Sequence, residues 1–181
     1  MKYWRLIVFG LVALVQLAVP GSLIWKREHT LRLGSVWKFR TAPVDPVDAF
    51  RGRYVALHFD VETEELKLPP DLEYHYTVFV TFKPSAEGFA DIDQVSEKAP
   101  ARDDFITAEL NGSSITLPFD KYWVTERDAP AADAAYQNLS RRGNQNTYVS
   151  VRIFRGDAAI EQLYLDNQPL GDYLRQSRTA K

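Results

Sequence analysis

The residues with the greatest capacity for chemistry lie in one short stretch ahead of the first long predicted strand. Asp45 and Asp48 supply two carboxylates, Arg51 and Arg53 supply two guanidiniums, and Tyr54 supplies a phenol. Carboxylates and guanidiniums this close in sequence can form charge-assisted hydrogen bonds, which would hold a structural corner of the chain together. The same side chains can instead line a binding cleft at the start of the strand. Both interpretations stay open, and the corner is preferred.

The backbone chemistry of this stretch is the reason for preferring the corner. Pro43 and Pro46 fix their own φ angles and push the residues before them into extended conformations. Asp45 and Asp48 can accept hydrogen bonds from nearby backbone amides in turns. Gly52 then permits a sharp bend into the strand that follows.

The strand after Gly52 must position the tyrosine. From residue 53 to residue 61 apolar and polar side chains alternate, which is the pattern of a half-buried strand. Leu57 is therefore a predicted core residue, whereas Tyr54 is predicted to cover the second side of the sheet. The apolar face consists of Val55, Leu57, Phe59 and Val61, and the opposite face of Tyr54, Ala56, His58 and Asp60.

The remaining patterns predict a mainly β fold with antiparallel pairing and a single short helix. Asn111-Gly112 joins two apolar segments into a predicted hairpin, because both residues accept positive φ. A second hairpin is predicted around residues 155–157. The single helix is predicted over residues 130–142, with Gly143 as its stop. The predicted strands cover residues 53–61, 74–82, 105–110, 113–119, 121–126, 147–154 and 160–165.

Other residues that could carry chemistry show no arrangement typical of a catalytic or metal site. His29, His58 and His75 lack the spacing of metal ligands, and the chain has no cysteine. No serine lies in a nucleophile-elbow pattern, and no glycine-rich phosphate loop occurs. We therefore expect no catalytic residue, no bound metal and no cofactor.

The distribution of charge argues against a nucleic-acid partner. All 24 acidic residues lie beyond residue 25, whereas Lys2 and Arg5, two of the 22 basic residues, precede it. The part beyond residue 25 is therefore acidic overall. Nucleic-acid binding needs a basic surface, so we expect none.

A segment without charge, from Leu6 to Trp25, predicts a membrane anchor. As a helix of about 20 residues it spans roughly 30 Å, the thickness of the hydrocarbon layer of a bilayer. Two alternatives are a cleaved secretory signal and a buried core helix. Pro20 disfavours signal cleavage, and a core helix would carry charges on one face. We expect a short tail over residues 1–5, a transmembrane helix over residues 6–25 that contacts the lipid bilayer, and one β-rich domain over residues 26–181.

The charges that flank this segment disagree about its orientation. Lys2 and Arg5 favour a cytoplasmic amino terminus, whereas Lys26, Arg27 and Arg32 favour the opposite. Because long domains translocate largely regardless of their charge, we expect the amino terminus inside the cell and the domain outside.

The stretch around Gly52 resembles a known family. Residues 52–59, Gly-Arg-Tyr-Val-Ala-Leu-His-Phe, occupy the motif that gives the GDYXXLXY proteins their name. Arg53 replaces the aspartate of the motif, and Phe59 replaces its final tyrosine. The resemblance extends over nearly the whole chain through Trp25-Lys26-Arg27-Glu28, Leu33-Gly34, Pro43-Val44-Asp45-Pro46, Asp48, Phe50-Arg51, Tyr122-Trp123-Val124-Thr125-Glu126 and the alanine-rich helix.

This resemblance implies a location and a kind of partner, but no activity. It implies a bacterial membrane-anchored protein. Together with the orientation expected above, this predicts a single-pass protein of the bacterial inner membrane whose domain lies on the periplasmic side. Members of the family accompany polytopic membrane proteins, so such a protein is the implied partner. The motif residues carried over are Pro43, Asp45, Pro46, Asp48, Arg51, Gly52, Tyr54 and Leu57.

Two functional hypotheses are compatible with these features. The preferred one is a non-enzymatic, membrane-anchored accessory protein that binds a partner. The alternative is an envelope hydrolase or peptidase that acts near the membrane surface, which requires a polar nucleophile beside a base in a cleft. Mutual hydrogen bonds that bury Asp45, Arg51 and Tyr54 would favour the structural corner, whereas their convergence in an open pocket would favour catalysis.

Overall fold

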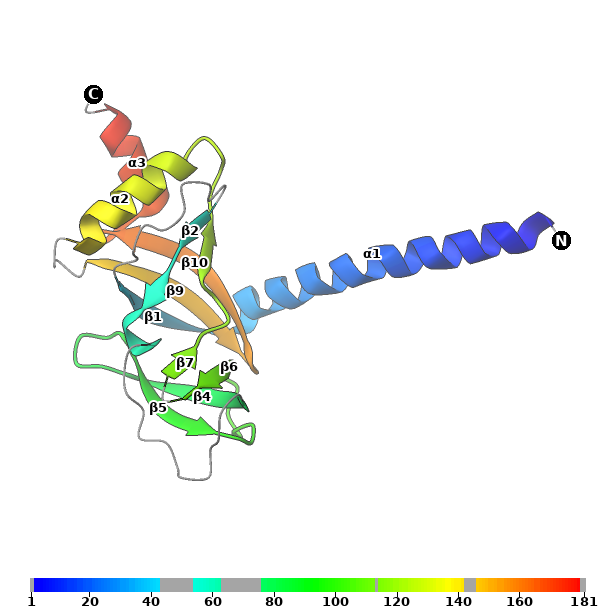
Figure 1. Cartoon of the computed structure of the whole chain (residues 1–181), viewed down its shortest axis with the longest axis horizontal. Coiled ribbons are helices and arrows are strands. Elements are labelled where there is room, and N and C mark those ends of the chain that lie inside the picture. The colour runs from blue at the N-terminus through cyan, green and yellow to red at the C-terminus, as the bar shows by residue number, and fades with distance from the viewer. Residues whose placement is uncertain (1, 43–53, 63–75, 113, 142–145, 180–181) are drawn as a thin grey trace.

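A long N-terminal helix projects from a β-rich domain that extends to both sides of its base (Figure 1). The structure is a computed structural model, and it describes residues 2–42, 54–62, 76–112, 114–141 and 146–179. The paired strands run antiparallel, and more of the described chain is strand than helix. The predicted mainly β fold with an apolar N-terminal helix is confirmed.

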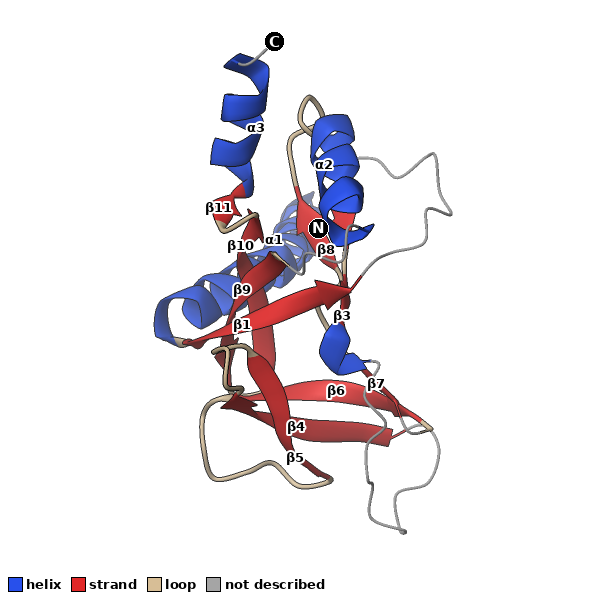
Figure 2. Ribbon diagram, turned by 90° about the vertical axis from the view of Figure 1, so that its left-hand side faces the viewer, coloured by secondary structure: helices blue, strands red, loops and turns tan. Residues whose placement is uncertain are grey.

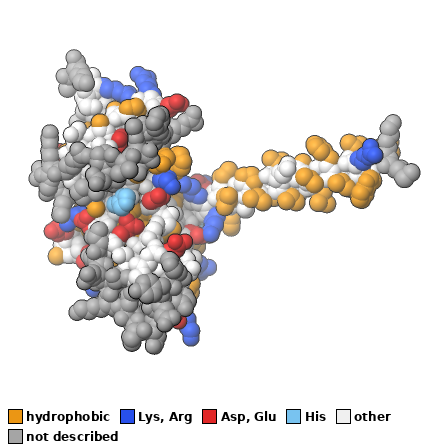
Figure 3. Space-filling model, viewed as in Figure 1, with side chains coloured by type: hydrophobic (Ala, Val, Ile, Leu, Met, Phe, Trp, Pro, Cys, Tyr) orange, Lys and Arg blue, Asp and Glu red, His pale blue; other side chains and the backbone are white. Residues whose placement is uncertain are grey.

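Helix α1 (Lys2–Leu33) is longer than the apolar segment that predicted it. It includes residues 2–5 and continues about two turns beyond Trp25. Apolar side chains cover its projecting part on the face seen in Figure 3, and none of its most apolar window is buried in the protein. A helix with apolar side chains all round needs an apolar environment, and this one is long and apolar enough to span a membrane.

Helix α1 packs at its carboxyl-terminal end against a five-stranded sheet. Its strand order is β11-β10-β9-β1-β3, and the central strand β9 is almost entirely buried. The predicted hairpin of β9 and β10 is confirmed, and Arg155 and Gly156 adopt the positive φ of its turn. Strand β1 was not predicted, although Trp37 and Phe39 alternate with Lys38 and Arg40 as in a half-buried strand. The bounds are β1 (Ser35–Ala42), β3 (His58–Phe59), β9 (Thr147–Phe154), β10 (Asp157–Leu165) and β11 (Gln168–Pro169).

A four-stranded sheet lies at the other end of the domain (Figure 2). Its order is β5-β4-β6-β7, and β7 pairs with β6 as the predicted hairpin, with Gly112 at φ 63° in the turn. The turn between β9 and β10 contacts β6: the Thr107 amide donates to the Gly156 carbonyl at 3.0 Å. The bounds are β4 (Tyr76–Pro84), β5 (Ala90–Ser96), β6 (Phe105–Asn111) and β7 (Ser114–Thr116). Strand β5 was not predicted.

The strand predicted over residues 53–61 is broken at Leu57, which corrects the sequence prediction. The Leu57 amide donates to the Asp120 carbonyl at 2.8 Å, so the chain changes partner there. Strand β2 (Tyr54–Ala56) pairs with β8 (Lys121–Trp123), whereas β3 pairs with β1. The turn of 3₁₀ helix η1 (Asp60–Glu62) follows β3. The predicted apolar face still enters the core, since Val55, Leu57, Phe59 and Val61 are all buried.

Helices α2 (Ala129–Arg141) and α3 (Leu170–Thr179) lie at the same end of the domain (Figure 2). Helix α2 was predicted, although Gly143, its predicted stop, lies outside the described residues. Helix α3 was not predicted, so the expectation of a single short helix in the domain is wrong. Only Leu170 and Leu174 of α3 are buried, and the Arg178 guanidinium pairs with Asp128 before α2.

Candidate functional site

Most of the predicted motif lies outside the part of the chain that the structure describes. This applies to Pro43, Asp45, Pro46, Asp48, Arg51 and Gly52, and also to His75. Their arrangement as a corner or a cleft therefore stays a prediction. Tyr54 and Leu57 are described, and they occupy different environments.

Leu57 is a core residue. Its side chain is 1% exposed, and its backbone closes the end of the pairing between β2 and β8 through the bond to Asp120. The leucine of the motif therefore stabilises the fold as a core residue.

Tyr54 lies on the opposite, outer face of the two-stranded β2–β8 ribbon. The register places Tyr54 opposite Trp123 and Ala56 opposite Lys121, and directly opposed residues share a face. The Tyr54 and Trp123 rings are 5.4 Å apart and inclined by 59°, and the Lys121 ammonium lies 5.7 Å from the Tyr54 ring centre. We call Tyr54, Ala56, Lys121 and Trp123 the ribbon face.

The inner face of the ribbon packs into the domain. Val55 is fully buried, and burial raises the pKa of the half-buried Tyr122 opposite it. Nearby, the Tyr136 hydroxyl of α2 donates to the Ala42 carbonyl at the end of β1, at 3.1 Å. Burial raises the pKa of Tyr136 to about 12. The ribbon is thus anchored on one side and open on the other.

A groove of about 720 Å³ runs between the ribbon face and the β6–β7 hairpin. Glu62 fixes one wall, because its carboxylate accepts the amides of Leu117 at 2.9 Å and Phe59 at 3.1 Å. The groove is lined mainly by hydroxyl, charged and imidazole side chains. These polar lining residues are Tyr54, His58, Glu62, Thr77, Thr107, Glu109, Ser114, Thr116, Asp120 and Lys121.

The groove brings His58 and Ser114 into one lining, which the sequence pattern did not foresee. Among the described residues, no hydrogen bond joins the His58 ring to the Ser114 hydroxyl. Within the same part of the chain, no cluster of three metal-ligating side chains occurs. The hydroxyl, charged and imidazole side chains of the groove can make polar contacts with a ligand.

The junction between α1 and β1 turns sharply at Gly34. The Gly34 amide donates to the Thr30 carbonyl at 2.9 Å, and a Cβ on residue 34 would lie 2.5 Å from that same oxygen. Only glycine fits there without movement of the backbone. The corner therefore sets the direction in which α1 leaves the domain.

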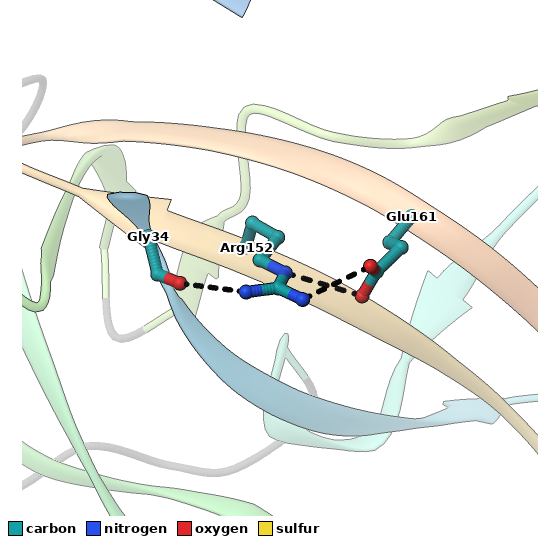
Figure 4. Close-up of polar contacts among 3 residues, drawn as sticks. All are labelled: Gly34, Arg152 and Glu161. Atoms are coloured by element: carbon teal, nitrogen blue, oxygen red, sulfur yellow. Dashed lines mark hydrogen bonds and ion pairs between the residues drawn. The ribbon is translucent and has the colours of Figure 1, made fainter. Parts of the chain in front are cut away.

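Side chains from the five-stranded sheet hold the same junction (Figure 4). The Arg152 guanidinium donates to the Gly34 carbonyl at 3.2 Å and to both carboxylate oxygens of Glu161 at 3.1 and 3.3 Å. About two turns before Gly34, the Lys26 ammonium of α1 pairs with the Asp157 carboxylate at 2.7 Å. The last turns of α1 are thus bound to β9 and β10.

His29 also belongs to this junction. Its ring stacks on Trp25 at 5.0 Å and meets the edge of Phe154 at 5.4 Å. These contacts explain His29 as a packing residue between the helix and the sheet.

One protein family has a model that matches this chain over both the junction and the ribbon. The family model described as GDYXXLXY protein matches residues 16–163, from the second half of the apolar part of α1 to near the end of β10. The chain matches no curated protein and no solved structure. The matched region contains the junction of α1 with the sheet, the motif stretch and the ribbon face, and the chain belongs to the GDYXXLXY family.

Proposed function

We propose that the protein is a single-pass, membrane-anchored accessory protein whose domain binds a partner without catalysing a reaction. Residues 6–25 cross the bacterial inner membrane, residues 1–5 remain in the cytoplasm, and residues 26–181 form the periplasmic domain. The partner that fits this arrangement is a polytopic membrane protein.

The observation that carries the proposal is the way in which α1 joins the domain. An exposed apolar helix on a flexible tether would only localise a domain. Here the Gly34 corner, the Arg152 contacts and the Lys26–Asp157 pair fix the helix to the sheet. A fixed helix holds the domain at one height and one orientation above the bilayer, which supports contact with another membrane protein.

The position of the groove supports the same function. Asp120 and Lys121 line the groove, and they also line a smaller hollow that borders Arg27 of α1. A ligand in the groove would therefore lie close to the end of the apolar segment. Hydroxyls and charges that line a groove beside the edge strand β7 suit the extended loop of a neighbouring protein.

Two measurements test anchoring and orientation. The full chain should remain in the membrane pellet after carbonate extraction, and alkaline phosphatase fused to its carboxyl terminus should be active. Release by carbonate would overturn the anchor. An inactive fusion on a stable, membrane-bound chain would overturn the periplasmic orientation.

Partner binding can be tested by site-specific crosslinking, because the chain has no cysteine of its own. Thr116→Cys places a photoactivatable label in the groove, and Gln94→Cys places the same label on the opposite edge strand of the same sheet. In native membranes we expect a specific adduct with a membrane protein from position 116 and none from position 94. Equal labelling from both positions would contradict a groove-bound partner.

The non-enzymatic part of the proposal has its own test. A fluorophosphonate probe should leave the purified protein unlabelled. Covalent labelling that is lost in Ser114→Ala would instead establish a nucleophilic serine in the groove and favour the envelope hydrolase.

A further inference from the structure

A small hollow lies on the flank of the domain beside α1. It has a volume of about 170 Å³ and is bordered by Arg27 of the helix and by Lys121 and Trp123 of the ribbon face. Residues of β10 complete it, including Ala158 and Ile160. Figure 3 shows hydrophobic and basic side chains together on this flank, next to the base of the helix.

The position of the hollow along the axis of α1 follows from Arg27, the helix residue that borders it. Arg27 lies two residues after Trp25, the last residue of the uncharged segment. The Lys26–Asp157 pair fixes the start of β10 at the same level. If α1 spans a bilayer, as proposed above, the hollow therefore lies at the level of the phospholipid headgroups.

The exposed side chains at this level match the headgroup region in chemistry. The Trp123 side chain is 61% exposed, and beyond α1 only Val36 is a comparably exposed large apolar residue among those described. Tryptophan prefers the membrane interface, because its ring is apolar and its N–H still needs a polar partner. An exposed tryptophan on the flank next to an anchor is well placed to meet lipid.

Two cations accompany the tryptophan. Arg27 has no ion-pair partner within the described part of the chain, and Lys121 has only the Asp120 carboxylate at 3.4 Å. With Asp120 included, the charged groups that border the hollow carry one net positive charge. Basic groups close to a bilayer surface attract phosphate and anionic headgroups.

We propose that the ribbon face is a second membrane contact, in which Trp123 enters the headgroup region and Arg27 and Lys121 bind the phosphate of a phospholipid. Tyr54 is a positioning residue: its ring supports Trp123 and lies under the Lys121 ammonium. The family motif thereby acquires a role for its tyrosine that depends on the ring and not on the hydroxyl. The domain is held down at two points, the helix and the ribbon.

The test uses the full chain in phospholipid vesicles with no other protein. Some vesicles carry bromine on the lipid chains near the headgroup, and others near the bilayer centre, because bromine quenches nearby tryptophan. The Trp123 signal is the emission of the wild type minus that of Trp123→Phe, which removes the contributions of the other tryptophans. We expect shallow bromine to quench this difference signal more strongly than deep bromine.

Further variants separate the role of each side chain. Tyr54→Phe should retain the quenching and Tyr54→Ala should lose most of it, since only the ring is needed. Replacing both cations, Arg27→Gln with Lys121→Gln, should reduce the quenching, and the loss should be larger in vesicles that contain anionic lipid. Exposed Gln94→Ala on the far edge of the other sheet is the matched control and should change nothing.

The outcomes distinguish this inference from the proposed function on which it rests. Failure of the chain to float with the vesicles would overturn the anchor. Flotation with an unquenched Trp123 signal would overturn the second contact and leave the anchor standing. Protection of Trp123 only in native membranes, and not in pure lipid vesicles, would also overturn it and would identify the ribbon face as a protein interface.

Discussion

The junction of α1 with the five-stranded sheet and the β2–β8 ribbon are built differently. At the junction, backbone groups approach so closely that Gly34 has no room for a Cβ, and Arg152 donates one hydrogen bond to the Gly34 carbonyl and two to Glu161 of β10. The ribbon has only three paired residues on each strand, and its outer face leaves Trp123 exposed. Close packing and satisfied polar groups indicate a structural role, whereas an exposed aromatic on a short ribbon indicates a contact surface.

The family motif contains one residue of each kind, a packed core residue and a residue of an exposed face. Leu57 belongs to the packed part of the ribbon, and Tyr54 belongs to its exposed face. Substitutions in the two regions should therefore separate stability from binding.

The largest loss of stability is expected from Leu57→Ala. The side chain is 1% exposed, so its removal leaves a cavity and should cost about 2–5 kcal/mol of unfolding free energy. Trp123→Ala on the same ribbon should cost about 1 kcal/mol or less, because the side chain is largely exposed. Chemical unfolding in detergent micelles, followed by circular dichroism, measures both. Equal losses would remove the distinction between the two faces of the ribbon.

Gly34→Ala should follow, with a loss of about 1–3 kcal/mol through overpacking. Its Cβ would meet the backbone oxygen of Thr30, which cannot move as a side chain can. Gly171→Ala is the matched control, because a Cβ there has nothing within 4 Å. We expect the control to unfold at the same temperature as the wild type or slightly above it. A Gly34→Ala variant of wild-type stability would show that the corner is adaptable.

Arg152→Met should cost about 1–2 kcal/mol, since it leaves the Gly34 carbonyl and the Glu161 carboxylate without their donor. A double-mutant cycle with Glu161→Gln should give a coupling energy that the exposed pair of Arg32 and Glu28 lacks. A second double-mutant cycle on Arg32 and Glu28 gives the coupling energy of a surface ion pair. If the coupling energies of the two cycles are equal, the Arg152 contacts contribute no more to the junction than a surface ion pair does.

Tyr136→Phe tests the far end of β1, with an expected loss of about 1 kcal/mol for the bond to the Ala42 carbonyl. The wild type should also lose stability as the pH rises from 10 to 12. Burial raises the pKa of Tyr136 from 10.0 to about 12, so the contribution is complete below pH 10 and is lost as the pH passes the folded value. Denaturant titrations at several pH values should show that the unfolding free energy of Tyr136→Phe decreases less between pH 10 and 12 than that of the wild type. Parallel curves would assign the decline to other groups, such as Tyr122, whose pKa burial also raises.

Features that depend on neighbouring residues could be predicted from the sequence. The apolar run of α1, the alternation of β4 and β9, and the Asn111-Gly112 turn are all local, and the structure confirms them. Three elements were missed: β1, although Trp37 and Phe39 alternate with Lys38 and Arg40; β5, whose register against β4 shifts between Ile92 and Gln94; and the short helix α3.

The candidate site was less accessible to such reasoning. The alternation over residues 53–61 predicted Leu57 as a core residue and placed Tyr54 on the opposite face, in agreement with the structure. No pattern around residue 54 indicated that Trp123 would be its neighbour, because the pairing joins segments far apart in the chain. The groove with His58 and Ser114 arises for the same reason.

By itself, the sequence determined that this protein has an apolar helix ahead of a β-rich, cysteine-free, acidic domain, because composition and period are properties of the chain. Only the tertiary structure decided that the strand breaks at Leu57, that α1 is fixed to β9 and β10, and that Arg27, Lys121 and Trp123 border one hollow. Each of these depends on a hydrogen bond or a contact between distant residues. Such contacts form only when the whole core is packed, so no local window contains them.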